Sequence, residues 1–238
     1  MRHDVSMGMF RRAGSAGLIV AAALLVFGGS AARAADTIQA DPTCCTFAPG
    51  PWSQDLGEIA NFNNPAGADA PHNVTANDKG PDGGPLFRSD SIVAGTTVPV
   101  KGTQYLKTGS YGFFCTIHGP SMNGRLAVEP GKGSVVPRPA IKVTIPNQSL
   151  NKVRNSGKLK VKVKATTKSS GISLKAKKGS KTLATSSGLK LSAGAGKTVK
   201  LKLKSSGRKA IRKGKKVKVS VKGSVSFGKP SDAKRTLR

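Results

Sequence analysis

Alternating apolar and polar residues dominate the second half of this 238-residue chain. In LKVKVKA (159–165), VKLKLK (199–204) and VKVSVKGSVSF (217–227), Leu or Val occupies every second position, with mostly Lys or Ser between. This period-two pattern is typical of β-strands that have one face on a core and the other in water. The stretch SGRKAIRKGKK (206–216) breaks the alternation, and we expect it to form a short helical turn between strands.

The first half carries shorter apolar segments and many more turn residues. Gly, Pro, Asn and Asp separate stretches rich in β-branched and aromatic residues, and helical periodicity is nearly absent from both halves. Many short strands with regular turn signals predict a β-sandwich or barrel. The segments are EIANFNN (58–64), HNVTA (72–76), TTVPV (96–100), YGFFC (111–115) and RLAV (125–128).

Charge separates the two halves sharply. Residues 35–130 hold five Lys and Arg against nine Asp and Glu, a net charge of −4, whereas residues 131–238 hold 31 against a single Asp, a net charge of +30. The switch falls in EPGKGSVVPRP (129–139), whose Gly and Pro content is typical of a linker. We expect one β domain over 35–130, a linker over 131–140 and an immunoglobulin-like β-sandwich over 141–238.

The first 34 residues have the pattern of an export signal. A basic start that includes Arg11 and Arg12 precedes an apolar run at 16–29 and the small-x-small sequence ARA at 32–34. The run is shorter than the roughly 20 residues of a transmembrane span. We expect an exported chain of residues 35–238 without a membrane span, extracellular, periplasmic or associated with the cell envelope. The pattern is compatible with both the general and the twin-arginine export route.

Few metal-binding side chains remain once this signal is removed. The mature chain keeps two His, one Met and three Cys, and YGFFCTIHGPSMNG (111–124) contains one of each. Two imidazoles, a thiolate and a distant thioether form the set found in blue-copper electron-transfer sites. Thiolate and thioether suit Cu(I) and imidazole also suits Cu(II), so this set can hold copper in both states. The candidate ligands are His72, Cys115, His118 and Met122.

Two longer stretches carry a family resemblance. NNPAGADAPHNVTA (63–76) followed by GSYGFFCTIHGPSMNGRLAV (109–128) resembles the plastocyanin/amicyanin branch of the cupredoxins, which are Greek-key β-sandwiches with one type I copper ion. The resemblance covers about residues 37–130 and agrees in ligand identity, order and loop. It implies that the four candidates bind copper. It also places Asn73 where the family hydrogen-bonds the cysteine sulfur through an amide, a contact that tunes the reduction potential.

The same resemblance implies a docking region for partner proteins. In this family the ligand after the Cys, here His118, exposes its imidazole edge within an apolar patch, and plastocyanins often carry a Tyr at the position of Phe114. Strand alternation points Phe114 outward and Phe113 and Cys115 inward. Rim residues of the patch are expected at Gly67, Pro71, Gly119 and Pro120.

Other metal chemistries fit these residues less well. Zinc normally takes a closed set of N and S ligands, among which Met is a poor one. Haem attachment needs a C-x-x-C-H motif that the chain lacks. A multicopper oxidase needs many more His residues, and a copper carrier or store favours exposed Met-rich or Cys-rich sites. We expect no enzyme and no catalytic residues, but a protein that passes single electrons from a redox protein donor to an acceptor.

Cys44 and Cys45 stand apart from this set. Adjacent Cα atoms lie about 3.8 Å apart, below the usual disulfide range of roughly 4.4–6.8 Å, so a disulfide between them is strained. A structural or vicinal pair is the first interpretation, an intermolecular bridge the second and a metal site the third.

The strong positive charge of residues 131–238 predicts a separate, anionic partner for this half. Lysines give sequence-independent binding to phosphates, but residues 131–238 contain one aromatic residue, Phe227, and no recognised nucleic-acid motif, so no specific nucleic acid is expected. Lys on strands also discourages edge-to-edge pairing, which does not account for the near absence of acids. We expect adhesion to an anionic envelope polymer or to lipid headgroups. The competing hypotheses are an envelope-adhesion protein with a non-redox cupredoxin scaffold, and a copper carrier.

Overall fold

The computed structural model describes residues 35–43 and 45–238. The expected export signal, residues 1–34, lies outside this part of the chain, as does Cys44.

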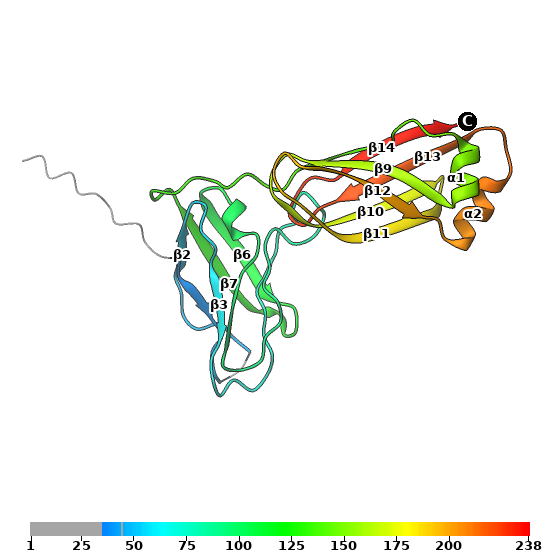
Figure 1. The fold of residues 1–238 in the computed structure, drawn as a ribbon. Helices are drawn as coiled ribbons and strands as arrows, with labels where there is room; N and C mark the ends of the chain where they lie inside the picture. The colour runs from blue at the N-terminus through cyan, green and yellow to red at the C-terminus, as the bar shows by residue number, and fades with distance from the viewer. Residues whose placement is uncertain (1–34, 44) are drawn as a thin grey trace, which may run out of the picture.

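Two hydrophobic cores organise the described chain. One core takes its buried side chains from between Ile38 and Val128, and the other from between Ile141 and Leu237. Each core lies between two β-sheets, so the prediction of two consecutive β-sandwiches is confirmed (Figure 1). We call residues 37–129 the acidic sandwich and residues 141–237 the basic sandwich.

The acidic sandwich mixes parallel and antiparallel strands. Its elements are β1 (Thr37–Gln39), β2 (Trp52–Asp55), β3 (Asn61–Asn64), β4 (Thr75–Ala76), β5 (Thr96–Pro99), the 3-10 helix η1 (Thr103–Tyr105), β6 (Gly109–Cys115) and β7 (Gly119–Glu129). The sheets have the orders β1-β3-β5 and β2-β7-β6-β4, and the pairs β1–β3 and β2–β7 are parallel. Phe47, at the centre of the core, packs edge to face on Trp52, Phe62 and Phe113, with ring centroids 5.0–6.2 Å apart.

The basic sandwich is antiparallel throughout its two sheets, β11-β10-β13-β14 and β12-β9-β8. Its strands are β8 (Ile141–Thr144), β9 (Lys158–Ala165), β10 (Ser169–Lys178), β11 (Lys181–Leu191), β12 (Gly196–Lys202), β13 (Val217–Ser224) and β14 (Ser231–Leu237). Burial alternates without interruption along β9 and nearly so along β13, as the sequence predicts.

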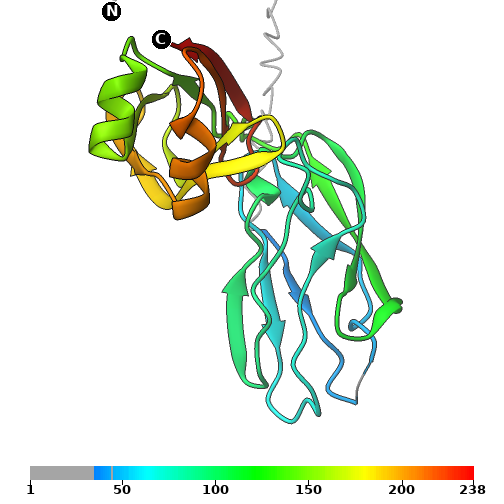
Figure 2. The same ribbon diagram turned by 90° about the vertical axis from the view of Figure 1, so that its right-hand side faces the viewer.

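Two short helices close one end of the basic sandwich, away from the acidic sandwich (Figures 1 and 2). The predicted helical turn is α2 (Ser205–Arg212). The other helix, α1 (Leu150–Ser156), was not predicted; the hydroxyl of Ser149 caps it by accepting from the Lys152 N–H. No helix in residues 35–43 or 45–238 is long and apolar enough to cross a membrane.

Phe227 joins the two sandwiches. Its backbone N–H donates to the Asp82 carboxylate at 2.8 Å, and its ring centroid lies 5.5 Å from the Arg88 guanidinium and 6.2 Å from the Tyr105 ring. Arg138 donates to the Phe227 carbonyl at 3.2 Å, and burial there lowers the pKa of its guanidinium. The single aromatic side chain of the basic half is therefore buried in an interface.

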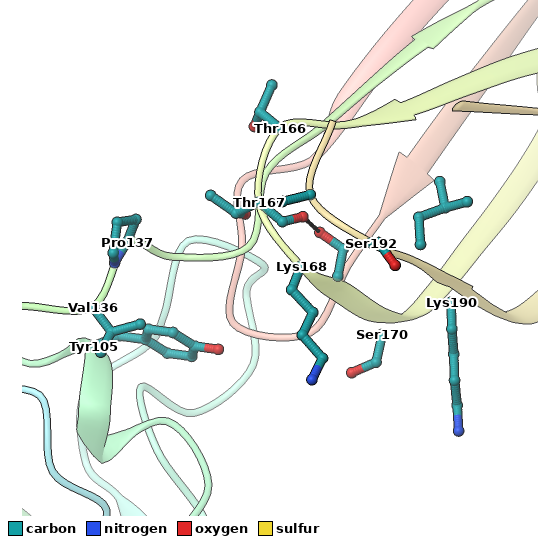
Figure 3. Close-up of a pocket in the computed structure, with 12 residues that line it drawn as sticks. Tyr105, Val136, Pro137, Thr166, Thr167, Lys168, Ser170, Lys190 and Ser192 are labelled. Atoms are coloured by element: carbon teal, nitrogen blue, oxygen red, sulfur yellow. Dashed lines mark hydrogen bonds between the residues drawn. The ribbon is translucent and has the colours of Figure 1, made fainter. Parts of the chain in front are cut away.

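A pocket of about 610 Å³ lies beside this junction. Tyr105, Val136 and Pro137 line one side, while the β9–β10 loop with Lys168 and the end of β11 with Lys190 line the other (Figure 3). The two sandwiches therefore meet over part of their facing ends and leave the rest open.

Strand β7 sets the distance between the predicted ligand loop and the linker. It begins at Gly119, directly after His118, and ends at Glu129, where the linker starts. The ten steps between its eleven residues, at about 3.3 Å each, span roughly 33 Å. The ligand loop therefore lies at the end of the acidic sandwich that is remote from the linker.

Replacing Phe227 by Ala should loosen the junction. The ring contacts with Arg88 and Tyr105 are lost, which we expect to weaken the coupling between the sandwiches by about 2–3 kcal/mol. Small-angle X-ray scattering should then give a larger radius of gyration. Val93→Ala, which truncates a side chain that is 64% exposed, is the control. An unchanged scattering curve for Phe227→Ala would contradict this role of the ring.

Candidate metal centre

The β6–β7 hairpin places one predicted ligand at a strand end. Cys115 is the last residue of β6, and its side chain lies on the buried face together with that of Phe113. The register shifts between Phe114 and Cys115, and Gly119 has a φ of +71°, a conformation that favours glycine. These two features let the chain turn within three residues and return along β7, where Met122 is fully buried.

His72 reaches the site from another part of the acidic sandwich. Its backbone exchanges two hydrogen bonds with Ile92, at 3.1 and 3.0 Å. The side chain of Asn64 donates to the carbonyls of Ala70 and Ile92, both at 3.1 Å, and is itself fully buried. Asn64 therefore fixes the loop before His72 and the segment that pairs with it.

The structure brings the four predicted ligands together. The Cys115 sulfur lies 3.9 Å from Nδ1 of His72 and 3.7 Å from Nδ1 of His118. One ligand atom of each of these three residues lies within 4.8 Å of the others, and Met122 is buried in the same apolar core. Only His118 is partly exposed.

The state of these side chains fits copper. Cys115 is a free thiol. Burial, and then the nearby His118, lower the pKa of His72, so that its imidazole is neutral and a ring nitrogen can bind a metal. A thiolate with two neutral imidazoles and a thioether is the donor set of a type I copper site.

The resemblance implies a hydrogen bond from an Asn73 amide to the Cys115 sulfur, and this contact stays a prediction. The Asn73 side chain bonds Thr116, the residue that follows Cys115. Its Nδ2 donates to the Thr116 hydroxyl at 2.7 Å, and its Oδ1 accepts from the Thr116 N–H at 3.0 Å. Because the side-chain amide is engaged on both sides, it ties the two ligand-bearing segments together.

The predicted docking residues are all at least partly exposed. Gly67, Pro71 and Pro120 are exposed, and Gly119 and Phe114 are partly exposed. Two apolar side chains were not predicted here: Ile117 is 48% exposed beside His118, and Val93 is 64% exposed beside Ile92. Ile117 could have been found from its place between two ligands. Val93 could not, because only the folded chain brings the Ile92 segment to His72.

Cys45 is in a different state from the cysteine of this centre. Cys45 is disulfide-bonded, in contrast to the free thiol of Cys115. Because a disulfide-bonded sulfur is no thiolate ligand, the interpretation of a metal site at Cys45 is wrong.

Fold and donor set together define a class: a β-sandwich with a Cys–His loop between its last two strands is the arrangement of the cupredoxins. No family model matches the chain. Over 141 residues the chain is 32% identical to a chloroplastic plastocyanin of Hordeum vulgare. The matched region covers 53% of this chain and 83% of the relative. The chain therefore belongs to the plastocyanin family.

Two solved structures are also similar to the chain. A purple cupredoxin from Nitrosopumilus maritimus is 23% identical, covering 32% of this chain and 75% of its own, with a TM-score of 0.26. A dithionite-reduced auracyanin from Roseiflexus castenholzii is 15% identical, covering 42% of this chain and 100% of its own, with a TM-score of 0.31.

Asn73→Ala should weaken the site without removing a ligand. Loss of both bonds to Thr116 frees the Cys115 loop from the His72 segment, and we expect copper affinity to fall about 10- to 100-fold, as for other residues that orient metal ligands. Competition with a copper chelator measures the change. Asn61→Ala, at an exposed position on β3, is the control. Equal affinities of the two variants would contradict the role of Asn73.

Proposed function

We propose that the chain is an exported one-electron carrier, retained by its basic sandwich at anionic material of the cell envelope. The observation that carries the proposal is the convergence of His72, Cys115 and His118 within 4.8 Å, beside the buried Met122, in a member of the plastocyanin family. Bound copper would supply the exchange of one electron between Cu(II) and Cu(I). The chain itself is not proposed as an enzyme.

The surroundings of the ligands support fast electron exchange. Asn64 holds the His72 segment through two carbonyls, and Asn73 ties it to the Cys115 loop. Ligands fixed from both sides move little when the charge of the site changes. A small movement means a small reorganisation energy, which is what a carrier requires.

Burial favours a carrier over an exchangeable store. His72, Cys115 and Met122 are fully buried, so a metal ion can leave only past His118. An electron needs no such opening, because the partly exposed imidazole of His118 connects the site with the surface. The exposed Ile117 beside it gives a partner protein an uncharged contact, suited to the small, short-lived interfaces of redox pairs.

The basic sandwich supports retention near a negative surface. With 31 Lys and Arg against one Asp in residues 131–238, it attracts anionic polymers or headgroups over a range set by salt. Export is proposed from the pattern of residues 1–34, which lie outside the described chain.

The first test is the visible spectrum of residues 35–238 after addition of Cu(II). We expect an intense blue thiolate-to-copper band that a mild reductant bleaches. Cys115→Ser should lose the band because the thiolate is gone, and Cys45→Ser should keep it because Cys45 is no ligand. A colourless wild-type protein would overturn the electron-transfer proposal and favour an adhesion protein on a cupredoxin scaffold.

A charge in the apolar patch should slow electron exchange and leave the spectrum unchanged. We expect Ile117→Lys to reduce the self-exchange rate between oxidised and reduced copies about tenfold, since contact through this patch then removes two ammonium groups from water, a cost that salt does not screen. Nuclear magnetic resonance line broadening at about 1 M salt measures the rate, where the Debye length of about 3 Å screens the basic sandwiches. Ile59→Lys, at a side chain that is 44% exposed in the segment before β3, is the matched control. If both variants exchange at the wild-type rate, electrons do not pass through this patch.

A further inference from the structure

One face of the sheet β12-β9-β8 carries lysines and no acid. The only acid of residues 131–238, Asp232, lies on β14 of the other sheet, opposite Lys222. Burial alternates along β9, so that four of its lysines point away from the core. Lysines of β8 and β12 pair with them in register. We call the exposed set the lysine face: Lys142, Lys158, Lys160, Lys162, Lys164, Lys200 and Lys202.

The strand register puts lysine directly opposite lysine on this face. The facing pairs are Lys158–Lys202, Lys160–Lys200 and Lys142–Lys164. Like charges directly opposite each other destabilise a sheet. Within the described part of the basic sandwich, no carboxylate side chain forms an ion pair that offsets this repulsion. The facing lysines therefore lower the folding stability of the basic sandwich.

Protection against aggregation does not account for this register. Lysines guard the edges of sheets, but β9 is the central strand of its sheet and carries the longest row. The other sheet of the same sandwich mixes its lysines with hydroxyls: Lys177 and Lys234 face Ser220, and Lys218 faces Thr236. That sheet also has two facing lysine pairs, Lys175–Lys222, where Asp232 faces Lys222 from the other side, and Lys178–Lys181 beside the β10–β11 turn. The lysine face differs because it has three such pairs and no acid.

A cavity of about 350 Å³ lies at one end of the lysine face, next to α1. Lys152, Lys158, Lys160 and Lys200 line it together with Asn147, Gln148 and Ser156. The Gln148 amide is engaged with the backbone of Lys160, at 2.8 and 2.9 Å. The Lys160 ammonium has no partner among the described residues, and no acidic side chain is among the residues that line this cavity with the four lysines.

We propose that the lysine face binds a linear phosphate polymer laid along β9, with one end of its path in this cavity. Outward residues of a strand recur about every 6.7 Å, so the four lysines of β9 cover roughly 20 Å of an extended polyanion. The neighbouring strands add lysines on both sides of that line. This inference rests on the proposed retention at the envelope and names the surface and chemistry responsible for it.

The apolar residues of the chain favour a polymer over a bilayer. Large exposed hydrophobic side chains of the described chain all lie before residue 141, at Ile59, Val93, Ile117, Val135 and Val136. The lysine face therefore lacks the apolar groups with which surface helices enter lipid. Base stacking is not available either, because Phe227 is buried at the junction.

The test measures binding of residues 35–238 to long-chain inorganic polyphosphate at low salt. We expect Lys160→Gln with Lys200→Gln to lower the affinity about tenfold or more, because both lysines lie at the cavity. Lys218→Gln with Lys234→Gln, on the other sheet, makes the same change in net charge and should lower it less than about threefold. The lysine-face variant should unfold at the wild-type temperature or higher, since a repulsive pair is removed. Lys162→Gln, which faces Thr144 and Thr198, is a second variant and should weaken binding by a smaller factor.

Equal losses in the two double variants would overturn the proposal, because net charge alone would then explain binding. Tighter binding to phosphatidylglycerol vesicles than to polyphosphate would overturn it in favour of a membrane surface. Inorganic phosphate at the same total concentration should compete poorly, and effective competition would show that no polymer is recognised. The blue band is recorded for every variant. A colourless protein that still binds polyphosphate refutes the copper proposal alone, and a blue protein that does not bind refutes this one alone.

Discussion

The two hydrogen bonds between Asn73 and Thr116 fix the geometry of the candidate metal centre. His72 and Cys115 are 43 residues apart, and two hydrogen bonds join the residues that directly follow them. Each such bond contributes only about 1 kcal/mol to stability. Their effect on geometry is larger, because they set where one ligand-bearing segment lies relative to the other. Asn64 positions the Ile92 segment relative to the loop before His72, so the ligand-bearing segments are held by side-chain amides that are not ligands themselves.

Much of the site was predictable because its chemistry is rare in this chain. With two His and one Met in residues 35–238, the choice of ligands was nearly forced. The amide network was not predictable, since Asn is common in turns and nothing local distinguishes Asn64 from its neighbour Asn63. The contacts of the Asn73 side chain with Thr116 were not predictable either, because the side-chain orientation depends on a loop from a distant strand.

The strands were predictable where Leu or Val alternates with Lys, as in β9 and β13. Strands β10 and β11 lack this pattern, because Ser, Thr and Gly occupy many of their positions and the register between them shifts repeatedly. Helix α1 is too short for periodicity to show: two residues, Leu150 and Val153, form its buried side. Long-range pairing, and not local preference, decides these elements.

The junction at Phe227 gives the two sandwiches a fixed relation, and this matters for how a retained carrier works. The ligand loop lies roughly 33 Å from the linker, measured along β7. A polymer held on the lysine face binds the basic sandwich, whereas His118 and Ile117 lie at the far end of the acidic sandwich. Since Asp82, Arg88 and Tyr105 hold Phe227 in place, binding at one end does not cover the other. In the proposed function, retention and electron exchange can therefore proceed at the same time, and a protein confined in this way would still present the imidazole edge of His118 to diffusing partners. The opposite charges of the halves agree with this proposal: residues 35–130, with a net charge of −4, have no attraction to the polymer that the basic sandwich is proposed to bind.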